Sequence, residues 1–139
     1  MLRFLLDTDV ISEGARPHGS ELLLARIEKH REECALAAPT WCELLYGLER
    51  LPAGRRREIV SAYLMELAAR SLVILPYETG AAAWHARERA RLDGAGTRPP
   101  FVDGQIAAVA AVNGLAVVTR NVRDFRLFRG VKVHDWTKG

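Results

Sequence analysis

Cysteine and long apolar runs are scarce in this chain of 139 residues, and each scarcity excludes a class of protein. The two cysteines, Cys34 and Cys42, form neither a metal-ligand spacing nor a disulfide framework. The apolar run at the N-terminus is interrupted by Arg3 and is too short for a signal peptide. No later stretch approaches the roughly 18 apolar residues that a membrane span needs. We therefore expect a cytoplasmic protein with reduced thiols and no membrane segment.

Lysine is also rare, whereas arginine is abundant. Of the 20 Lys and Arg residues only three are lysines, Lys29, Lys132 and Lys138, and the formal net charge is +3. A guanidinium binds phosphates and carboxylates in a bidentate manner and stacks on bases. The composition therefore suits a nucleic acid or an acidic protein as the partner.

Hydrophobic periodicity predicts strands that alternate with helices in a single domain spanning residues 1–139. The expected strands cover residues 2–6, 34–38, 72–75 and 115–119, with a further edge strand at 131–134. The expected helices cover residues 20–33, 40–51, 55–70, 79–92 and 102–112. Such alternation predicts an α/β fold whose parallel sheet is covered by helices on both faces.

Acidic and amide side chains lie after predicted strands or, for Asp103, at the start of the helix before the fourth strand. We expect them to face the edge where sites of parallel sheets gather. These residues are Asp7, Glu43, Asp103, Asn121 and Asp124. Carboxylates that meet at one edge repel each other unless a cation lies among them. Mg²⁺ prefers carboxylate oxygens and keeps several waters, so that a water can attack a phosphodiester.

Each of these residues also has a purely structural interpretation. Glu43 lies three residues after Thr40, which is the spacing of a capping box. Asp103 could complement the dipole of the helix that it opens. Asp124 could pair with a neighbouring arginine, and Asn121 is a common turn residue.

Three segments, LLDTDVISE, TWCELLYGLER and FVDGQIAAVAAVNGLAVVTRNVRDF, together resemble the PIN-domain family, specifically the VapC-type toxins of bacterial toxin–antitoxin pairs. The resemblance extends from Phe4 to about Trp136. It implies a Rossmann-like α/β/α sandwich with a central parallel sheet. It also implies a Mg²⁺-dependent endoribonuclease, with Mn²⁺ as a possible substitute, that forms a homodimer and is inhibited by a cognate antitoxin.

The resemblance also implies roles for individual residues. Asp7, Glu43 and Asp103 match the three core acids of the family, with Asp7 and Asp103 as direct metal ligands. Glu43 then orients the attacking water or holds a second ion. The fourth site residue is either Asn121 or Asp124.

A second group of residues borders this expected site. Arg120 and Arg123 are candidates for contact with RNA phosphates or with an antitoxin. Ser12 is a candidate for a hydrogen bond within the site, for the cap of the helix that follows, or for contact with RNA or an antitoxin. Asp9, where relatives more often have Asn, is expected to support the ligands without being one. His85 is expected to be packed or on the surface.

Two other functions compete with this interpretation. A haloacid-dehalogenase-like phosphatase would use Asp7 and Asp9 as nucleophile and acid, but no lysine follows a strand where it could hold the phosphate. A PIN-like partner that mainly binds an antitoxin and supports DNA repression would need no catalysis. The complete set of core acids argues against the second, because clustered carboxylates without a cation are destabilising.

Overall fold

The computed structural model describes residues 1–70 and 72–139, which contain a five-stranded sheet in the order β3-β2-β1-β4-β5. All four pairings between neighbouring strands are parallel, as the sequence predicts. The strands are β1 (Phe4–Leu6), β2 (Cys34–Ala37), β3 (Val73–Leu75), β4 (Ala116–Val118) and β5 (Val133–His134). The predicted strand at 131–134 is confirmed as the edge strand β5.

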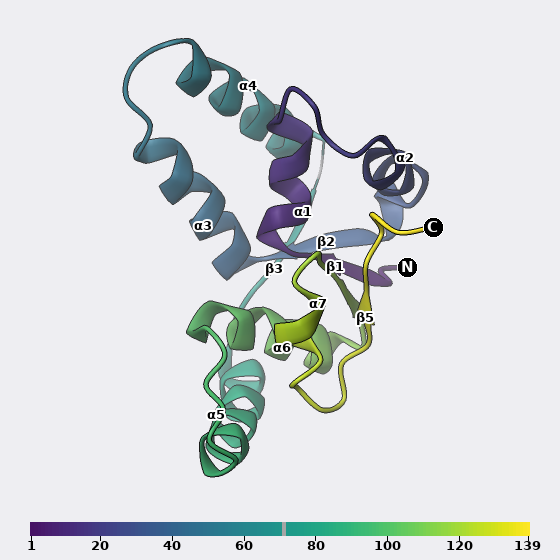
Figure 1. Cartoon of the computed structure of the whole chain (residues 1–139), viewed down its shortest axis with the longest axis vertical. Coiled ribbons are helices and arrows are strands. Elements are labelled where there is room, and N and C mark those ends of the chain that lie inside the picture. Colours follow the sequence, from purple (N-terminus) through teal and green to yellow (C-terminus); the bar gives the residue numbers. More distant parts are fainter. Residues whose placement is uncertain (71) are drawn as a thin grey trace.

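Helices cover both faces of the sheet and give the expected α/β/α sandwich (Figure 1). They are α1 (Thr8–Ser12), the 3₁₀ helix η1 (Glu13–Ala15), α2 (Glu21–Lys29), the 3₁₀ helix η2 (Arg31–Glu33), α3 (Ala38–Glu49), α4 (Arg55–Ala69), α5 (Thr79–Gly94), α6 (Phe101–Asn113) and α7 (Val122–Phe125). Among the described residues, no helix is both long enough and apolar enough to cross a membrane.

The central strands contribute side chains to two separate cores, because successive residues of a strand point to opposite faces. Leu5 packs with α5, α6 and Phe125 on one face. Phe4 and Leu6 pack with α1, α2, α3 and α4 on the other. Burial on both faces explains why these strands are continuous apolar runs rather than alternating ones.

The two shortest α-helices and one helix end differ from the sequence prediction. Helices α1 and α7 were not predicted, since four or five residues are too few to show a helical period. The helix predicted over 20–33 ends at Lys29, after which η2 leads into β2. The other predicted boundaries agree with the structure to within about two residues, the usual uncertainty of helix ends.

Helices α5 and α6 pack closely because a glycine lies at their contact. A Cβ atom on Gly104 would lie 2.2 Å from Nε2 of His85. His85 is buried, and its Nδ1 is 3.0 Å from the Tyr77 hydroxyl, which confirms the expectation that it is packed. Helix α6 ends at Gly114 with a φ of 67°, as the Asn113-Gly114 pair predicts. The first turn of α6, with Asp103, is therefore carried by a tightly packed helix.

Candidate active site

Asp7 and Thr119 lie side by side at the carboxyl edge of the sheet. Because Leu6 pairs with Val118 in the β1–β4 register, the residues that follow both strands are neighbours. Oδ2 of Asp7 accepts a hydrogen bond from the Thr119 hydroxyl at 2.8 Å. Its Oδ1 accepts one from the backbone N–H of Thr8 at 2.8 Å, so Asp7 also caps α1. The Asp7 residue is only 6% exposed.

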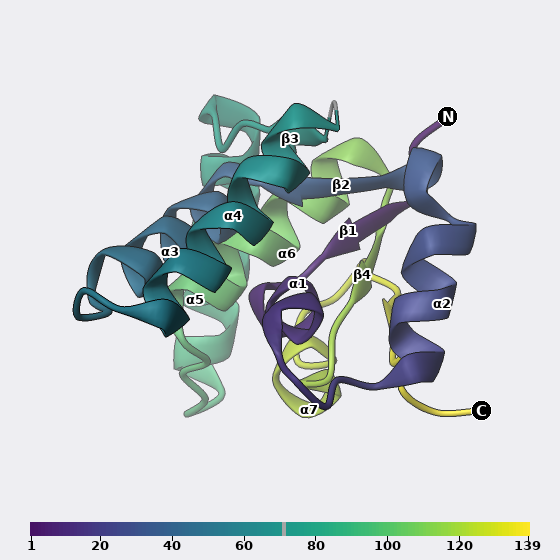
Figure 2. The same ribbon diagram turned by 90° about the horizontal axis from the view of Figure 1, so that it is seen from above.

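Glu43 reaches this edge from α3, which follows β2 without an intervening loop (Figure 2). The Thr8 hydroxyl donates a hydrogen bond to Oε1 of Glu43 at 2.5 Å. The capping-box interpretation of Glu43 is wrong, because the N-cap of α3 is Ala37 and Thr40 lies inside the helix. Pro39 in the first turn favours this earlier start. The Glu43 side chain is therefore held by Thr8 of α1 and does not cap the start of its own helix, α3.

Asp103, Asn121 and Asp124 form a hydrogen-bonded group. Nδ2 of Asn121 donates to Oδ2 of Asp124 at 2.9 Å and to Oδ2 of Asp103 at 3.3 Å. The proposed pairing of Asp124 with an arginine is wrong for Arg120, which forms an ion pair with Glu13 instead. Asp103 lies in the first turn of α6, so its interpretation as a helix-dipole acid is compatible with a place in the site.

The carboxyls of this edge raise one another's proton affinity. Burial is the main reason that the pKa of Asp7 rises to about 6, and the charges of Asp9 and Glu43 add to the rise. Burial likewise leads the rise of the Asp103 pKa to about 7, followed by the charges of Asp7, Asp124 and Glu43. The Thr119 hydroxyl opposes the rise at Asp7 by donating to the charged form. The structure thus brings the predicted acids into one electrostatically coupled group.

Asp9 lies behind this group, one helical residue beyond Thr8. Burial raises the pKa of Asp9, while the backbone N–H and the charge of Arg120 lower it. Oδ1 of Asp9 is buried and has no hydrogen-bond partner among the described residues. This carboxylate oxygen beside the acidic group is therefore not engaged by any described residue.

The chemistry of the donor set fits a divalent cation bound mainly through water. Within residues 1–70 and 72–139, no three His, Cys, Asp or Glu side chains form a ready-made ligand cage. The carboxyls are instead spaced by the hydrogen-bond donors of Thr8, Thr119 and Asn121. Mg²⁺ usually binds one or two carboxylates and keeps several waters, so a closed cage is not required.

Three site contacts were missed in the sequence. Thr8 and Thr119 hold Glu43 and Asp7, and Glu13 holds Arg120. The position of Thr119 directly after β4 could have indicated it, since Asp7 was chosen for the same position after β1. No local signal marks Glu13, because its partner is 107 positions away.

The predicted bordering residues lie in different surroundings. Ser12 is half-buried and lines a concavity of about 270 Å³ together with Thr8, Glu43 and Tyr63. Arg123 is exposed on α7, beside the acidic group. Arg120 is also exposed, yet one of its guanidinium nitrogens is bound by Glu13.

Comparison with known proteins agrees with this geometry. A family model described as PIN domain matches residues 4–130. The tRNA(fMet)-specific endonuclease VapC of Salmonella typhimurium is 32% identical over 98% of this chain and 99% of its own length. The VapC ribonuclease Y4jK of Sinorhizobium fredii is 35% identical over 87% of this chain and 89% of its own length.

A solved structure shows the same similarity. In the crystal structure of FitAcB from Neisseria gonorrhoeae, a chain that is 32% identical superposes with a TM-score of 0.86 and covers 96% of this chain and 97% of that one. A second, the DNA-bound VapBC complex of Salmonella typhimurium, gives a TM-score of 0.83 at 32% identity and covers 98% and 99% of the two chains.

Proposed function

The chain belongs to the PIN-domain family, and on that premise we propose that it is a metal-dependent endoribonuclease that acts as the toxin of a type II toxin–antitoxin pair. The observation that carries the proposal is the gathering of acids at one edge of the sheet, where burial and then coupling to the charges of Asp7 and Glu43 raise the pKa of Asp103. Such coupling is relieved by a cation, and a cation at carboxylates is the usual means of phosphodiester hydrolysis.

We propose Mg²⁺ as the ion, with Mn²⁺ as a substitute, held by Asp7 and Asp103. When bound, the ion supplies a more acidic water and stabilises the charge that develops on the phosphate. Glu43 is exposed and fixed by Thr8, so its free oxygen can orient a water toward the scissile phosphate or contribute to a second ion. Asn121 donates to Asp103 and keeps its carboxylate aimed at the same place.

RNA is the substrate in this proposal, as it is for the similar VapC ribonucleases. The exposed Arg123 lies on the same turn as Asn121 and Asp124, so its guanidinium can contact RNA phosphates beside the site. The arginine-rich composition favours the same polyanion. Transfer, ribosomal and messenger RNA all present this chemistry, and we propose that cleavage occurs in the cytoplasm, where they are found.

A protein antitoxin is the proposed regulatory partner, in line with the complexes of the similar FitB and VapC toxins. The concavity that Ser12 and Glu43 line continues along apolar side chains of α3 and α4, and Arg16 and Arg56 lie at its rim. We also propose a homodimer. The exposed apolar side chains of Tyr46 and Met65 on α3 and α4 support an interface.

The competing function, a partner that binds an antitoxin and supports DNA repression without catalysis, is favoured by one comparison, since the similar Salmonella complex is bound to DNA. Asp7→Asn separates the two functions. We expect the variant to lose RNA cleavage and to retain binding of the cognate antitoxin, measured by co-purification. Equal cleavage by the variant and the wild type would contradict the site assignment.

The phosphatase alternative has less support. The model that matches residues 4–130 is described as PIN domain, which supports our proposal that Asp7 binds a metal ion instead of acting as the nucleophile of a phosphatase. Hydrolysis of a small phosphomonoester by the wild type, without cleavage of RNA, is the result that would favour the phosphatase.

A further inference from the structure

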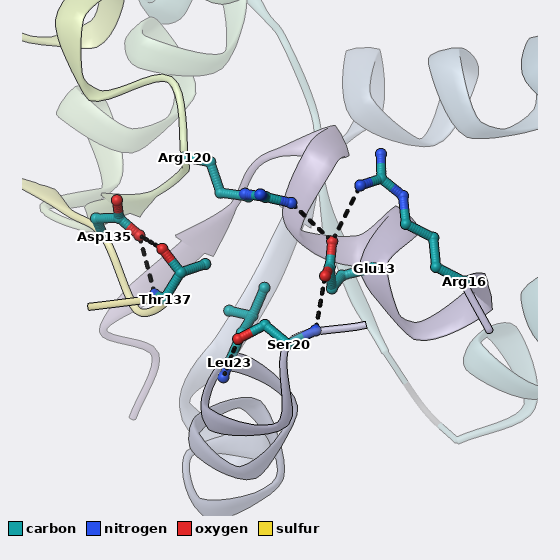
Figure 3. A network of polar contacts seen from close by, with 7 residues as sticks. All are labelled: Glu13, Arg16, Ser20, Leu23, Arg120, Asp135 and Thr137. Atoms are coloured by element: carbon teal, nitrogen blue, oxygen red, sulfur yellow. Dashed lines mark hydrogen bonds and ion pairs between the residues drawn. The ribbon is translucent and has the colours of Figure 1, made fainter. Parts of the chain in front are cut away.

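Glu13 is a buried carboxylate that accepts three hydrogen bonds from within the protein. It lies in η1 and is 4% exposed. Its Oε2 accepts from Arg120 at 2.9 Å and from Arg16 at 3.3 Å, and its Oε1 accepts from the backbone N–H of Ser20 at 2.7 Å (Figure 3). A buried side chain that binds three donors on three different residues is a structural anchor.

The anchor holds the turn that carries the site contacts. Arg120 lies between Thr119, which donates to Asp7, and Asn121, which donates to Asp103. The Asn121 backbone N–H also donates to the Thr119 hydroxyl at 2.9 Å, so the three residues form one rigid turn. Glu13 binds the guanidinium of Arg120, the middle residue of that turn.

The platform that carries Glu13 is itself tightly packed. The Tyr63 hydroxyl donates to the carbonyl of Ile11 at 2.7 Å and thereby joins α1 to α4. A Cβ on Gly14 would lie 2.2 Å from that hydroxyl oxygen, and a Cβ on Gly19 would lie 2.7 Å from the Glu13 carbonyl. Since α1 begins at Asp7, the contacts close a ring that runs from Asp7 through α1 to Glu13, Arg120, Thr119 and back.

We propose that Glu13 is a positioning residue for the metal site: through Arg120 it keeps Thr119 and Asn121 on the two carboxylates that bind the ion. This rests on the proposed function, because it assigns Asp7 and Asp103 to the ion. Arg120 then acts within the protein, and RNA contact at this turn is left to Arg123. Residues that orient metal ligands in this way typically contribute about 10-fold or more to metal affinity.

Two single variants distinguish positioning from simple charge effects. Glu13→Gln removes a negative charge near the site, and Arg120→Gln removes a positive one. A purely electrostatic role predicts opposite changes in metal affinity, weaker for Glu13→Gln and stronger for Arg120→Gln. Positioning predicts that both variants bind Mn²⁺ about 10-fold more weakly, and that the double variant is no weaker than either single one.

The experiment measures Mn²⁺ binding calorimetrically on the full chain without RNA, together with amide exchange of the turn at 119–122 in chelator. The matched control is Glu88→Gln. Glu88 is also mostly buried and pairs with an arginine, Arg91, but both residues lie in α5, away from η1 and the turn at 119–122. We expect faster exchange of the turn in Glu13→Gln and Arg120→Gln, and wild-type exchange and affinity in Glu88→Gln.

The outcomes separate this proposal from the proposed function. Unchanged exchange of the turn, or opposite shifts in Mn²⁺ affinity for the two single variants, would overturn the positioning role. Absence of Mn²⁺ binding by the wild type would instead contradict the metal-dependent function, and the exchange data would still test the anchor. If Glu13→Gln does not fold, Arg120→Gln and the charge-retaining Arg120→Lys give the same comparison, with Arg120→Lys expected to stay closer to the wild type.

Discussion

The Thr119 hydroxyl donates a hydrogen bond to Oδ2 of Asp7 at 2.8 Å, across 112 positions of sequence. Both side chains are buried, and both directly follow neighbouring parallel strands. Because the hydroxyl favours the charged form of Asp7, it opposes the burial that raises the pKa of this carboxyl. The contact therefore favours the anionic form of a buried carboxyl, which is the form that the proposed metal site needs.

Replacing Thr119 with valine, which has the same shape but no hydroxyl, tests this contact. We expect Thr119→Val to raise the pKa of Asp7 above about 6 and to weaken Mn²⁺ binding about 10-fold. Thr119→Ser retains the donor and is the control. Calorimetric titration with Mn²⁺ near neutral pH measures both, and equal affinity of the valine and serine variants would contradict the role of the hydroxyl.

Asn121 separates two carboxyls, and Asn121→Asp would place a third beside them. The variant loses the donor to Asp103 and Asp124, so in chelator at about pH 8 we expect a loss of roughly 1–3 kcal/mol in the free energy of unfolding. Mn²⁺ should restore most of this loss. Asn113→Asp, whose amide donates only to the Val109 carbonyl, is the control. An equal loss in the free energy of unfolding with and without Mn²⁺ would show that the added carboxylate does not interact with the ion.

The raised pKa values predict how the stability of the metal-free protein depends on pH. The Asp103 carboxyl has an ordinary pKa of 3.8 and a folded-state pKa of about 7, so the native state holds a proton that the unfolded chain has lost. The contribution of Asp103 to the free energy of unfolding is therefore most favourable below about pH 4. It becomes less favourable as the pH rises from about 4 toward 7.

Asp103→Asn removes this dependence. In chelator we expect the variant to melt about 2–5 °C above the wild type at about pH 8, and to show no such advantage near pH 4. Thermal unfolding in both buffers measures the difference. An advantage that is the same at both pH values would mean that the carboxyl is not destabilised by its neighbours.

Gly104→Ala tests the packing that carries Asp103. A Cβ at this position meets His85 at 2.2 Å, and His85 is buried against Tyr77. We expect a loss of about 1–3 kcal/mol by chemical denaturation, the usual cost of overpacking, and reduced cleavage because α6 must shift. Gly80→Ala, near the start of α5, meets nothing within 4 Å and is the control. Wild-type stability of Gly104→Ala would show that the two helices adjust freely.

Much of the fold was predictable because its signals are local. Hydrophobic patterns marked all five strands, and the rule that sites gather at carboxyl edges selected Asp7 and Asn121. Asp103 was selected as the acid that opens the helix before β4. The capping-box interpretation of Glu43 failed because sequence spacing does not show where a helix begins. Ala37 is the N-cap of α3 and Pro39 lies in its first turn, so Thr40 is inside the helix and cannot be its N-cap.

The contacts that hold the site were not predictable, because they connect elements far apart in the chain. Thr8 and Thr119 are ordinary residues until the strand register places them beside the acids. Glu13 resembles any surface acid in the sequence, and only the packing of η1 shows that it is buried. Spacing finds candidate ligands, whereas tertiary structure identifies the residues that orient them.

The most direct test of the central claim is cleavage of a mixed RNA pool by the antitoxin-free protein, with Mg²⁺, with Mn²⁺ and with excess chelator, beside the Asp7→Asn/Asp103→Asn variant. A ribonuclease with its ion at these carboxyls cuts the pool in either metal, stops in chelator, and is inactive as the folded double variant. Cleavage that persists in chelator, or in the double variant, would contradict the assignment of the metal to Asp7 and Asp103.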